Sequence, residues 1–399
     1  MDPQLWHTRP LLAFASLLPV PLGALWMILA PALPPFARRR ALLTALTWLL
    51  TRVAFGALVW GALGHSGIDQ LTFFLPQARH ALAGQLVYRD FPSAYGPLFA
   101  PLLAVAVAAL GNVGPFVLFL CADFIAWRAL AAADGEASEA AWGYVALPLV
   151  WYLAVRYAQD EPLCAAFIAL AYLAHKRAWP MLAGLALGVG LLVTKPLFAL
   201  PALPFLLAGR GRARLVLAAA APVVLVYGAL LVMRAPVLQP FTLEGGNFGV
   251  GPTLWRVPVT LLHFDLPGAT GWLPFAALLA AGVALLVRRG APLEAHAAWQ
   301  YGAFAALSPK FMIMYAIMWA PLIAVWAAKD PDRRGWWLPY GATLPLAWYL
   351  DSGPMQGLFG IGWQVVGVAG IIGVALLALW PLAEMRRAAD PTGSPDAAA

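Results

Sequence analysis

The side chains best suited to chemistry in this sequence are charged residues that interrupt long apolar stretches. Asp69 follows such a stretch in Gly67-Ile68-Asp69-Gln70, and a carboxylate there can act as a general base on a bound hydroxyl. The same position suits a helix N-cap, because an amphipathic segment, 71–82, comes next. Both interpretations of Asp69 stay open at the level of sequence.

Two more acids stand at the start of an expected helix. Asp160 and Glu161 precede Pro162 in the turn 157–161, where the helix dipole favours negative charge by about 0.3–1 kcal/mol. Capping alone would account for one of them. The other is a candidate for binding a substrate, and the sequence does not decide which.

Two lysines lie next to prolines inside apolar sequence. Lys195, in Thr194-Lys195-Pro196, interrupts the apolar stretch 180–208, although a lysine at membrane depth costs up to about 3 kcal/mol. Lys310 has the same setting in Ser308-Pro309-Lys310-Phe311. We expect both to lie at helix breaks, with Lys195 a phosphate contact.

A loop rich in aromatic residues, proline and glycine follows the Asp69 segment. It reads Tyr88-Arg89-Asp90-Phe91 and then Tyr95-Gly96-Pro97-Leu98. Its aromatic rings suit a ligand site, but they equally suit the aromatic belt at the level of lipid headgroups. Arg89 and Asp90 could form a surface ion pair worth under about 1 kcal/mol.

The composition decides what kind of molecule must position these residues. Of 399 residues, 62% are hydrophobic and 11% charged, with a mean hydropathy of +0.78, whereas soluble domains carry about 25% charged residues. The apolar residues form long runs without the alternation of barrel strands. We therefore expect an all-α, polytopic helical membrane protein and exclude a water-soluble enzyme.

The distribution of positive charge predicts the topology. The net charge of +7 is spread over short Lys and Arg clusters between apolar runs, which indicates cytoplasmic loops and not a nucleic-acid site. The clusters predict about 12–13 transmembrane helices in a single domain, 1–385, and a disordered cytoplasmic tail, 386–399. The predicted helices include 41–63, 113–131, 140–156, 336–350 and 357–381. The outer side would hold the long loops 64–112 and 234–270.

Two segments and four single residues complete the predictions from the sequence. The short apolar segment 97–111 is expected to lie in the outer membrane interface instead of crossing. Segment 11–33 either spans the membrane or forms a re-entrant hairpin, because Pro19, Pro21 and Pro31 lie within it and Pro34 follows it directly. Arg52 and Asp123, both in inner halves of helices, are expected to pair. Cys121 and Cys164 are interpreted as small buried hydrophobes.

The order of these motifs resembles the GT-C superfamily of membrane glycosyltransferases that use polyprenyl-phosphate sugars, notably the branch with protein O-mannosyltransferases and the lipid A aminoarabinose transferase. Gln70 stands where an acid is expected, so no metal-binding acidic pair is present there, and no cofactor is indicated. The stretches that carry the resemblance are Asp69-Gln70 with Tyr88-Arg89-Asp90-Phe91 and Tyr95-Gly96-Pro97-Leu98; Gln159-Asp160-Glu161-Pro162 with Gly184, Gly188 and Thr194-Lys195-Pro196-Leu197; and Ser308-Pro309-Lys310-Phe311 with Trp319 and Pro321.

The resemblance implies transfer of a sugar from a polyprenyl-phosphate donor to a hydroxyl of a lipid, glycan or protein acceptor. This would happen on the extracytoplasmic face of a bacterial inner membrane, with Asp69 deprotonating or orienting the acceptor. Positive groups would stabilise the leaving phosphate. The candidate substrate-binding residues are Gln70, Tyr88, Arg89, Asp90, Tyr95, Asp160, Glu161, Lys195, Arg256 and Lys310.

Two other classes of function remain as alternatives. A transporter or lipid flippase would show broken helices and charges at the membrane midplane. No inverted repeat is evident, and the unusual polar residues gather on one predicted face. A non-catalytic assembly subunit would keep the fold without the chemistry, and only an activity assay separates it from the transferase.

Overall fold

A computed structural model describes residues 18–30, 36–62, 67, 69–208, 211–245, 253, 255, 268–330, 333 and 341. Within these residues the regular elements are helices, and extended segments pair only in an isolated bridge between Val87 and Phe91. The all-α prediction is confirmed. Apart from Gly341, the predicted helices at 336–350 and 357–381 and the predicted tail lie outside the described residues.

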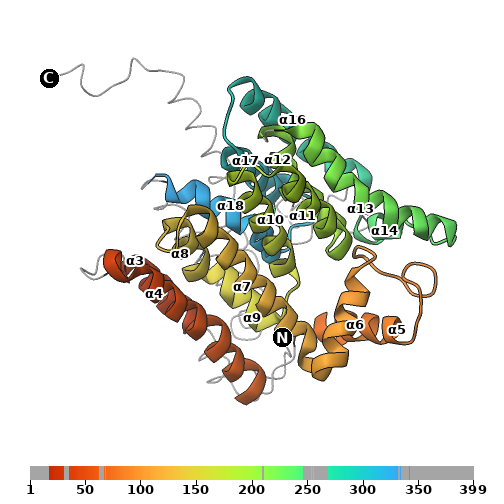
Figure 1. Ribbon diagram of the computed structural model, residues 1–399, viewed down its shortest axis with the longest axis horizontal. Coiled ribbons are helices and arrows are strands. Elements are labelled where there is room, and N and C mark those ends of the chain that lie inside the picture. The colour runs from red at the N-terminus through yellow and green to blue at the C-terminus, as the bar shows by residue number, and fades with distance from the viewer. Residues whose placement is uncertain are drawn as a thin grey trace.

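The N-terminal helices lie along one side of the molecule (Figure 1). Helix α3 (Pro19–Leu29) packs against α8 and α9. Helix α4 (Phe36–Trp48) continues through π-helical turns at Leu49–Ala54 and Ala57–Ala62, which confirms the helix predicted over 41–63. The ends of the segment 11–33 lie outside the described residues, so its path through a membrane stays open.

The first predicted outer loop contains two short helices. Helix α5 (Leu75–Leu82) packs against α6 (Phe99–Leu110), and α7 (Gly114–Asp134) follows after a sharp turn. Gly111 adopts a left-handed φ of 65°, and a Cβ atom on Gly114 would overlap the carbonyl of Ala106. Segments 97–111 and 113–131 are therefore separate helices, as predicted. The interfacial position of 97–111 stays a prediction.

One predicted helix is broken in two. The segment 140–156 forms α8 (Glu139–Ala146) and α9 (Pro148–Tyr157), with Leu147 in extended conformation between them. The prediction of one continuous helix was wrong because Pro148 has no N–H to donate and its ring restricts the residue before it.

Helix α10 (Glu161–Lys176) lies at the centre of the helical bundle. It packs against α7, α11 (Pro180–Val193) and α18 (Ala316–Ala328), and α17 (Leu293–Leu307) packs against α18. Helices α10 and α11 are consecutive and packed side by side. The start of α10 therefore lies near the end of α11, and the end of α10 lies near the start of α11. This pairing positions the polar residues described below.

The remaining helices surround this centre. Helix α12 (Ala199–Ala208) packs against α17, which also contacts α16 (Gly268–Arg288). Helix α13 (Arg212–Val232) lies along α11, where Gly184 and Gly188 approach its backbone so closely that a Cβ atom would overlap a carbonyl oxygen. Helix α14 (Gln239–Gly245) follows α13.

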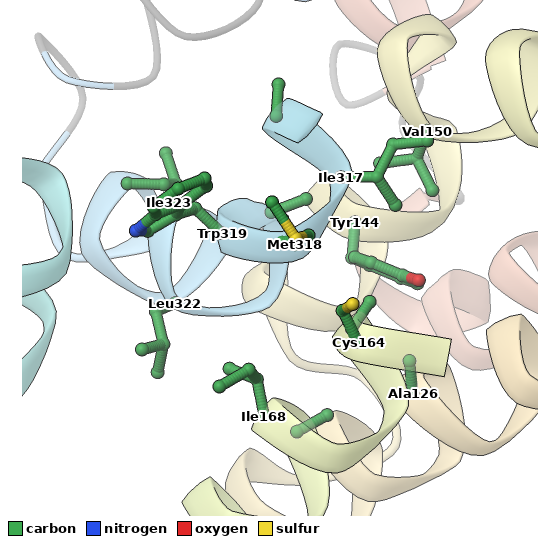
Figure 2. Packing of buried hydrophobic residues seen from close by; sticks show 14 of the residues in the cluster. Ala126, Tyr144, Val150, Cys164, Ile168, Ile317, Met318, Trp319, Leu322 and Ile323 are labelled. Carbon is green, nitrogen blue, oxygen red and sulfur yellow. The ribbon is translucent and has the colours of Figure 1, made fainter. Parts of the chain in front are cut away.

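The core contains large aromatic and aliphatic side chains from α8, α9, α10 and α18. Figure 2 shows Tyr144, Ile168 and Trp319 within this cluster, and Trp151 and Trp319 are among the largest fully buried side chains. Cys164 is buried here, as predicted. Cys121 is exposed on a face of α7 that no described helix covers, so its prediction as a buried residue was wrong.

Arg52 and Asp123 form the predicted ion pair. Arg52 Nε lies 2.9 Å from Asp123 Oδ2, and both side chains are buried. Trp48 Nε1 and the Tyr144 hydroxyl donate hydrogen bonds of 2.7 and 2.9 Å to the Asp123 carboxylate. The Arg52 guanidinium also donates to the Val145 carbonyl. The shared hydrogen bonds compensate the desolvation of both charges, so this cluster is structural.

Four helical stretches among the described residues are long and apolar enough to cross a membrane. They point to an integral membrane protein. On one of them, α13, Leu225 is 74% exposed and Val232 is 85% exposed, as expected for side chains that face lipid. The four stretches are Arg39–Gly61, Phe99–Asp134, Arg212–Val232 and Thr270–Arg288.

Candidate functional site

The structure brings Lys195 together with both acids of the turn 157–161. Lys195 follows α11, and its Nζ lies 2.8 Å from Glu161 Oε1 and 3.1 Å from Asp160 Oδ1. All three side chains are buried. Sequence analysis predicted these residues separately, and the packing of α10 on α11 makes them one cluster, which we call the lysine–acid cluster.

Two tyrosine rings cover the lysine. Lys195 Nζ lies 5.4 Å from the centre of the Tyr95 ring and 4.9 Å from that of Tyr315, within the range of cation–π attraction. The Tyr95 hydroxyl also lies 3.4 Å from Asp160 Oδ1. Sequence analysis missed Tyr315, which lies in the short 3-10 turn before α18; its position just after the Lys310 motif was the available signal.

Asp69 joins this cluster through a glutamine. Gln159 Nε2 donates a 2.8 Å hydrogen bond to Asp69 Oδ2, and Gln159 is the neighbour of Asp160. The Asp69 side chain makes no capping hydrogen bond to the helical turn that follows it, so the N-cap interpretation is wrong. Asp69 is half-buried. Gln159 was not predicted as a site residue.

Close backbone contacts hold the motifs together. Gly96 N donates a 2.5 Å hydrogen bond to the carbonyl of Thr194, and Leu98 N donates one of 2.9 Å to that of Leu192. A Cβ atom on Gly96 would overlap the Leu192 carbonyl oxygen, and one on Gly67 would lie 2.5 Å from that of Tyr157. Glycine at these positions therefore lets the first predicted outer loop reach the ends of α9 and α11.

The lysine–acid cluster has more negative than positive groups. Burial raises the pKa of Asp160, and burial together with repulsion from Asp160 raises the pKa of Glu161 to about 7. Lys195 opposes both shifts, but one ammonium cannot neutralise two buried carboxylates. Asp160 Oδ2 and Glu161 Oε2 are buried without hydrogen-bond partners. A proton on Glu161, whose pKa is raised to about 7, would offset this surplus of acid.

Tyr88 and Gln70 have positions that support the site from outside. Tyr88 adopts a left-handed φ of 68°, and its hydroxyl donates a 2.5 Å hydrogen bond to the Tyr95 carbonyl. Gln70 is buried, and its Nε2 donates to the Asn112 carbonyl at 2.5 Å. Tyr88 thus fixes the backbone of Tyr95, and Gln70 fixes the backbone of Asn112 in the turn before α7.

Arg89 and Asp90 pair with each other at the surface. Arg89 Nε lies 2.9 Å from Asp90 Oδ1, and the Leu86 N–H donates to the same carboxylate. The hydrogen bond from Arg89 lowers the pKa of Asp90. Neither residue contacts the lysine–acid cluster through any hydrogen bond or ion pair described here. The surface ion pair foreseen from sequence is therefore present.

Lys310 is the last of the predicted site residues that the structure describes. Lys310 is half-buried in the turn after α17, where Ser308 Oγ donates a 2.7 Å hydrogen bond to the Lys310 carbonyl. Arg256 lies outside the described residues. Among the described residues, no group of three or more His, Cys, Asp and Glu side chains has metal-binding geometry.

Comparisons of the chain with protein-family models, curated proteins and solved structures found no match. The resemblance to the GT-C superfamily therefore rests on the motifs given above.

Proposed function

We propose that this protein is a GT-C-type membrane glycosyltransferase that moves a sugar from a polyprenyl-phosphate donor to an acceptor hydroxyl. The observation that carries the proposal is the meeting of motifs distant in sequence. Asp69, Tyr95, Asp160 and Lys195, which belong to the first two stretches of the resemblance, lie at one end of the bundle, and Tyr315 follows the third.

Asp69 is the proposed general base. Its carboxylate is half-buried, and Gln159 holds one of its oxygens, leaving Oδ1 to accept a proton from an acceptor hydroxyl. The amide of Gln159 orients the Asp69 carboxylate through this hydrogen bond. General-base catalysis of this kind contributes about 10²–10⁴-fold to a rate.

Lys195 is the proposed contact for the donor phosphate. Its ammonium is shared by two acids, so a phosphate must compete with at least one of them. Because the pKa of Glu161 is near neutral, protonation of that acid weakens its hold on the lysine. The phosphate would then replace Glu161 as an ion-pair partner of Lys195. Arg89, Arg256 and Lys310 remain proposed phosphate contacts, and Gln70, Tyr88, Asp90 and Tyr95 proposed parts of the site.

The site is proposed to open on the extracytoplasmic face of a bacterial inner membrane, in a bundle of about 12–13 transmembrane helices. The four long apolar helical stretches and the basic clusters between the apolar segments support this arrangement. A lipid-linked donor would then reach the lysine–acid cluster from the outer leaflet.

The test is an activity assay on the purified full chain with a panel of polyprenyl-phosphate sugars, with products identified by mass spectrometry. Asp69→Asn should lower transfer about 10²–10⁴-fold with little change in thermal stability. Glu136→Gln removes an exposed acid that pairs with Arg128, and it should leave transfer unchanged.

Near-wild-type transfer by Asp69→Asn would remove Asp69 from the mechanism. No product from the wild-type chain with any donor would favour an assembly subunit or a transporter instead.

A further inference from the structure

A second polar cavity lies at the other end of the same helices. It has a volume of about 630 Å³ and is bordered by the C-terminal ends of α10 and α18 and by the starts of α11, α13 and α17. Helix α10 begins at Glu161 in the candidate site and ends at Lys176 in this cavity, a distance of about 22 Å at 1.5 Å per residue. The cavity is therefore separate from the lysine–acid cluster.

Positive charge exceeds negative charge in the wall of this cavity. Lys176, Arg214 and Lys329 line it, with Glu294 as the acid among the described lining residues. Lys329 pairs with Glu294, and Lys176 Nζ lies 3.1 Å from Asp134 Oδ1. Arg214 has no acidic partner among the described residues. An anion in the cavity would complete the pairing of Arg214.

The backbone adds further hydrogen-bond donors. The residues before α11, α13 and α17 are Trp179, Gly211 and Pro292, and all three line the cavity. None of these three residues makes a side-chain capping bond to the start of its helix. Each helix start also carries partial positive charge toward the cavity.

These observations point to one class of ligand. We propose that this cavity binds a phosphate group through Arg214, with Lys176 and Lys329 beside it. A planar guanidinium matches phosphate oxygens in a bidentate manner, and three helix starts add charge of the same sign. The charge pattern predicts that this end of the bundle is cytoplasmic, where both lipid headgroups and free phosphates occur. The proposal does not depend on the proposed transferase activity.

The test measures binding to the purified, delipidated full chain. One arm uses native mass spectrometry with phosphatidylglycerol, and the other uses isothermal titration with inorganic phosphate. Arg214→Glu should weaken binding at least tenfold, because it removes the proposed contact and places an acid in the cavity. Arg288→Glu is the matched control, since Arg288 is exposed at the end of α16 without lining the cavity, and it should change binding less than twofold.

The two arms identify the source of the phosphate. Loss confined to the lipid arm in Arg214→Glu supports a headgroup site, and loss in the phosphate arm supports a soluble ligand. Equal losses in both variants would show nonspecific attraction and overturn the proposal. The absence of binding in both arms would also overturn the proposal, as would binding that Arg214→Glu leaves unchanged.

Discussion

At the scale of single residues, the lysine–acid cluster contains two acidic side chains and one basic side chain. Lys195 faces Asp160 and Glu161 in a buried site, and each acid keeps one oxygen without a partner. Breaking a buried ion pair by removing one partner costs about 3–5 kcal/mol, so each of these groups constrains the others. The surplus carboxylate is neutralised most easily by a proton.

This imbalance predicts a pH dependence of stability. The ordinary pKa of Glu161 is 4.5, and the folded protein raises it to about 7. Between these values the folded state binds more protons than the unfolded state, so this group's contribution to stability is present at low pH and is lost as the pH rises through 7. Glu161→Gln, which resembles the protonated acid, should reduce this loss.

The measurement is the thermal midpoint of the purified chain in detergent between pH 5 and pH 8.5, for the wild type and Glu161→Gln. Glu136→Gln, at an exposed acid, serves as the control and should follow the wild-type curve. Parallel curves for the wild type and Glu161→Gln would contradict the proposed proton in the cluster.

At the scale of elements, the candidate site depends on how closely the first outer loop approaches α11. The contact between Gly96 and the end of α11 leaves no space for a side chain, because the atoms it would meet belong to the backbone. Two hydrogen bonds from this loop to the carbonyls of Thr194 and Leu192 fix its register. Tyr95 is thereby placed over Lys195.

Gly96→Ala should therefore destabilise the protein by about 1–3 kcal/mol, the usual cost of forcing an extra carbon into a packed site. Proposed transfer activity should fall with it, because Tyr95 loses its position. Thermal unfolding and the activity assay check both effects.

The matched control for Gly96→Ala is Gly143→Ala in α8. A Cβ atom on Gly143 would meet Ala324 at 3.9 Å, an ordinary contact, and alanine favours a helix over glycine. We expect this variant to be neutral or slightly stabilising. Equal effects of the two substitutions would show that close approach at Gly96 is unimportant.

At the scale of the whole molecule, two polar regions lie at opposite ends of one apolar bundle. The lysine–acid cluster is at the start of α10, and the basic cavity is at its end. Exposed apolar side chains on the outer helices agree with a lipid environment between these ends. If the bundle spans a membrane, the two regions face opposite compartments.

This orientation predicts opposite accessibility for two engineered cysteines. In a background with Cys121→Ala and Cys164→Ala, Arg89→Cys should react with a membrane-impermeant maleimide in intact cells. Arg177→Cys should react only after permeabilisation. Both native side chains are exposed, so either cysteine is within reach of the reagent on its own side.

Gel-shift detection of the labelled chain measures this accessibility. Labelling of both cysteines in intact cells, or of Arg177→Cys alone, would contradict the predicted topology.

The sequence by itself determined that the described part of the chain is helical, and it marked several of the helix ends. Apolar runs set the helices, and Pro196, Gly111 and Gly114 mark breaks that the structure contains, because proline and glycine act through local backbone geometry. The pairing of Arg52 with Asp123 was also foreseen, since a charge inside an apolar helix requires a partner. Pro148 itself could have predicted the break between α8 and α9, but the segment was predicted as one continuous helix.

Only the tertiary structure decided which polar groups act together. Lys195 meets Glu161 across 34 positions, and Gln159 meets Asp69 across 90, through the packing of helices that no local pattern encodes. The same packing gave Asp69 a contact to Gln159 and thereby decided between its two interpretations. It also gathered Arg214 and three uncapped helix starts around one cavity. Helix ends follow from nearby residues, whereas partners across the bundle follow from the fit of whole helix surfaces.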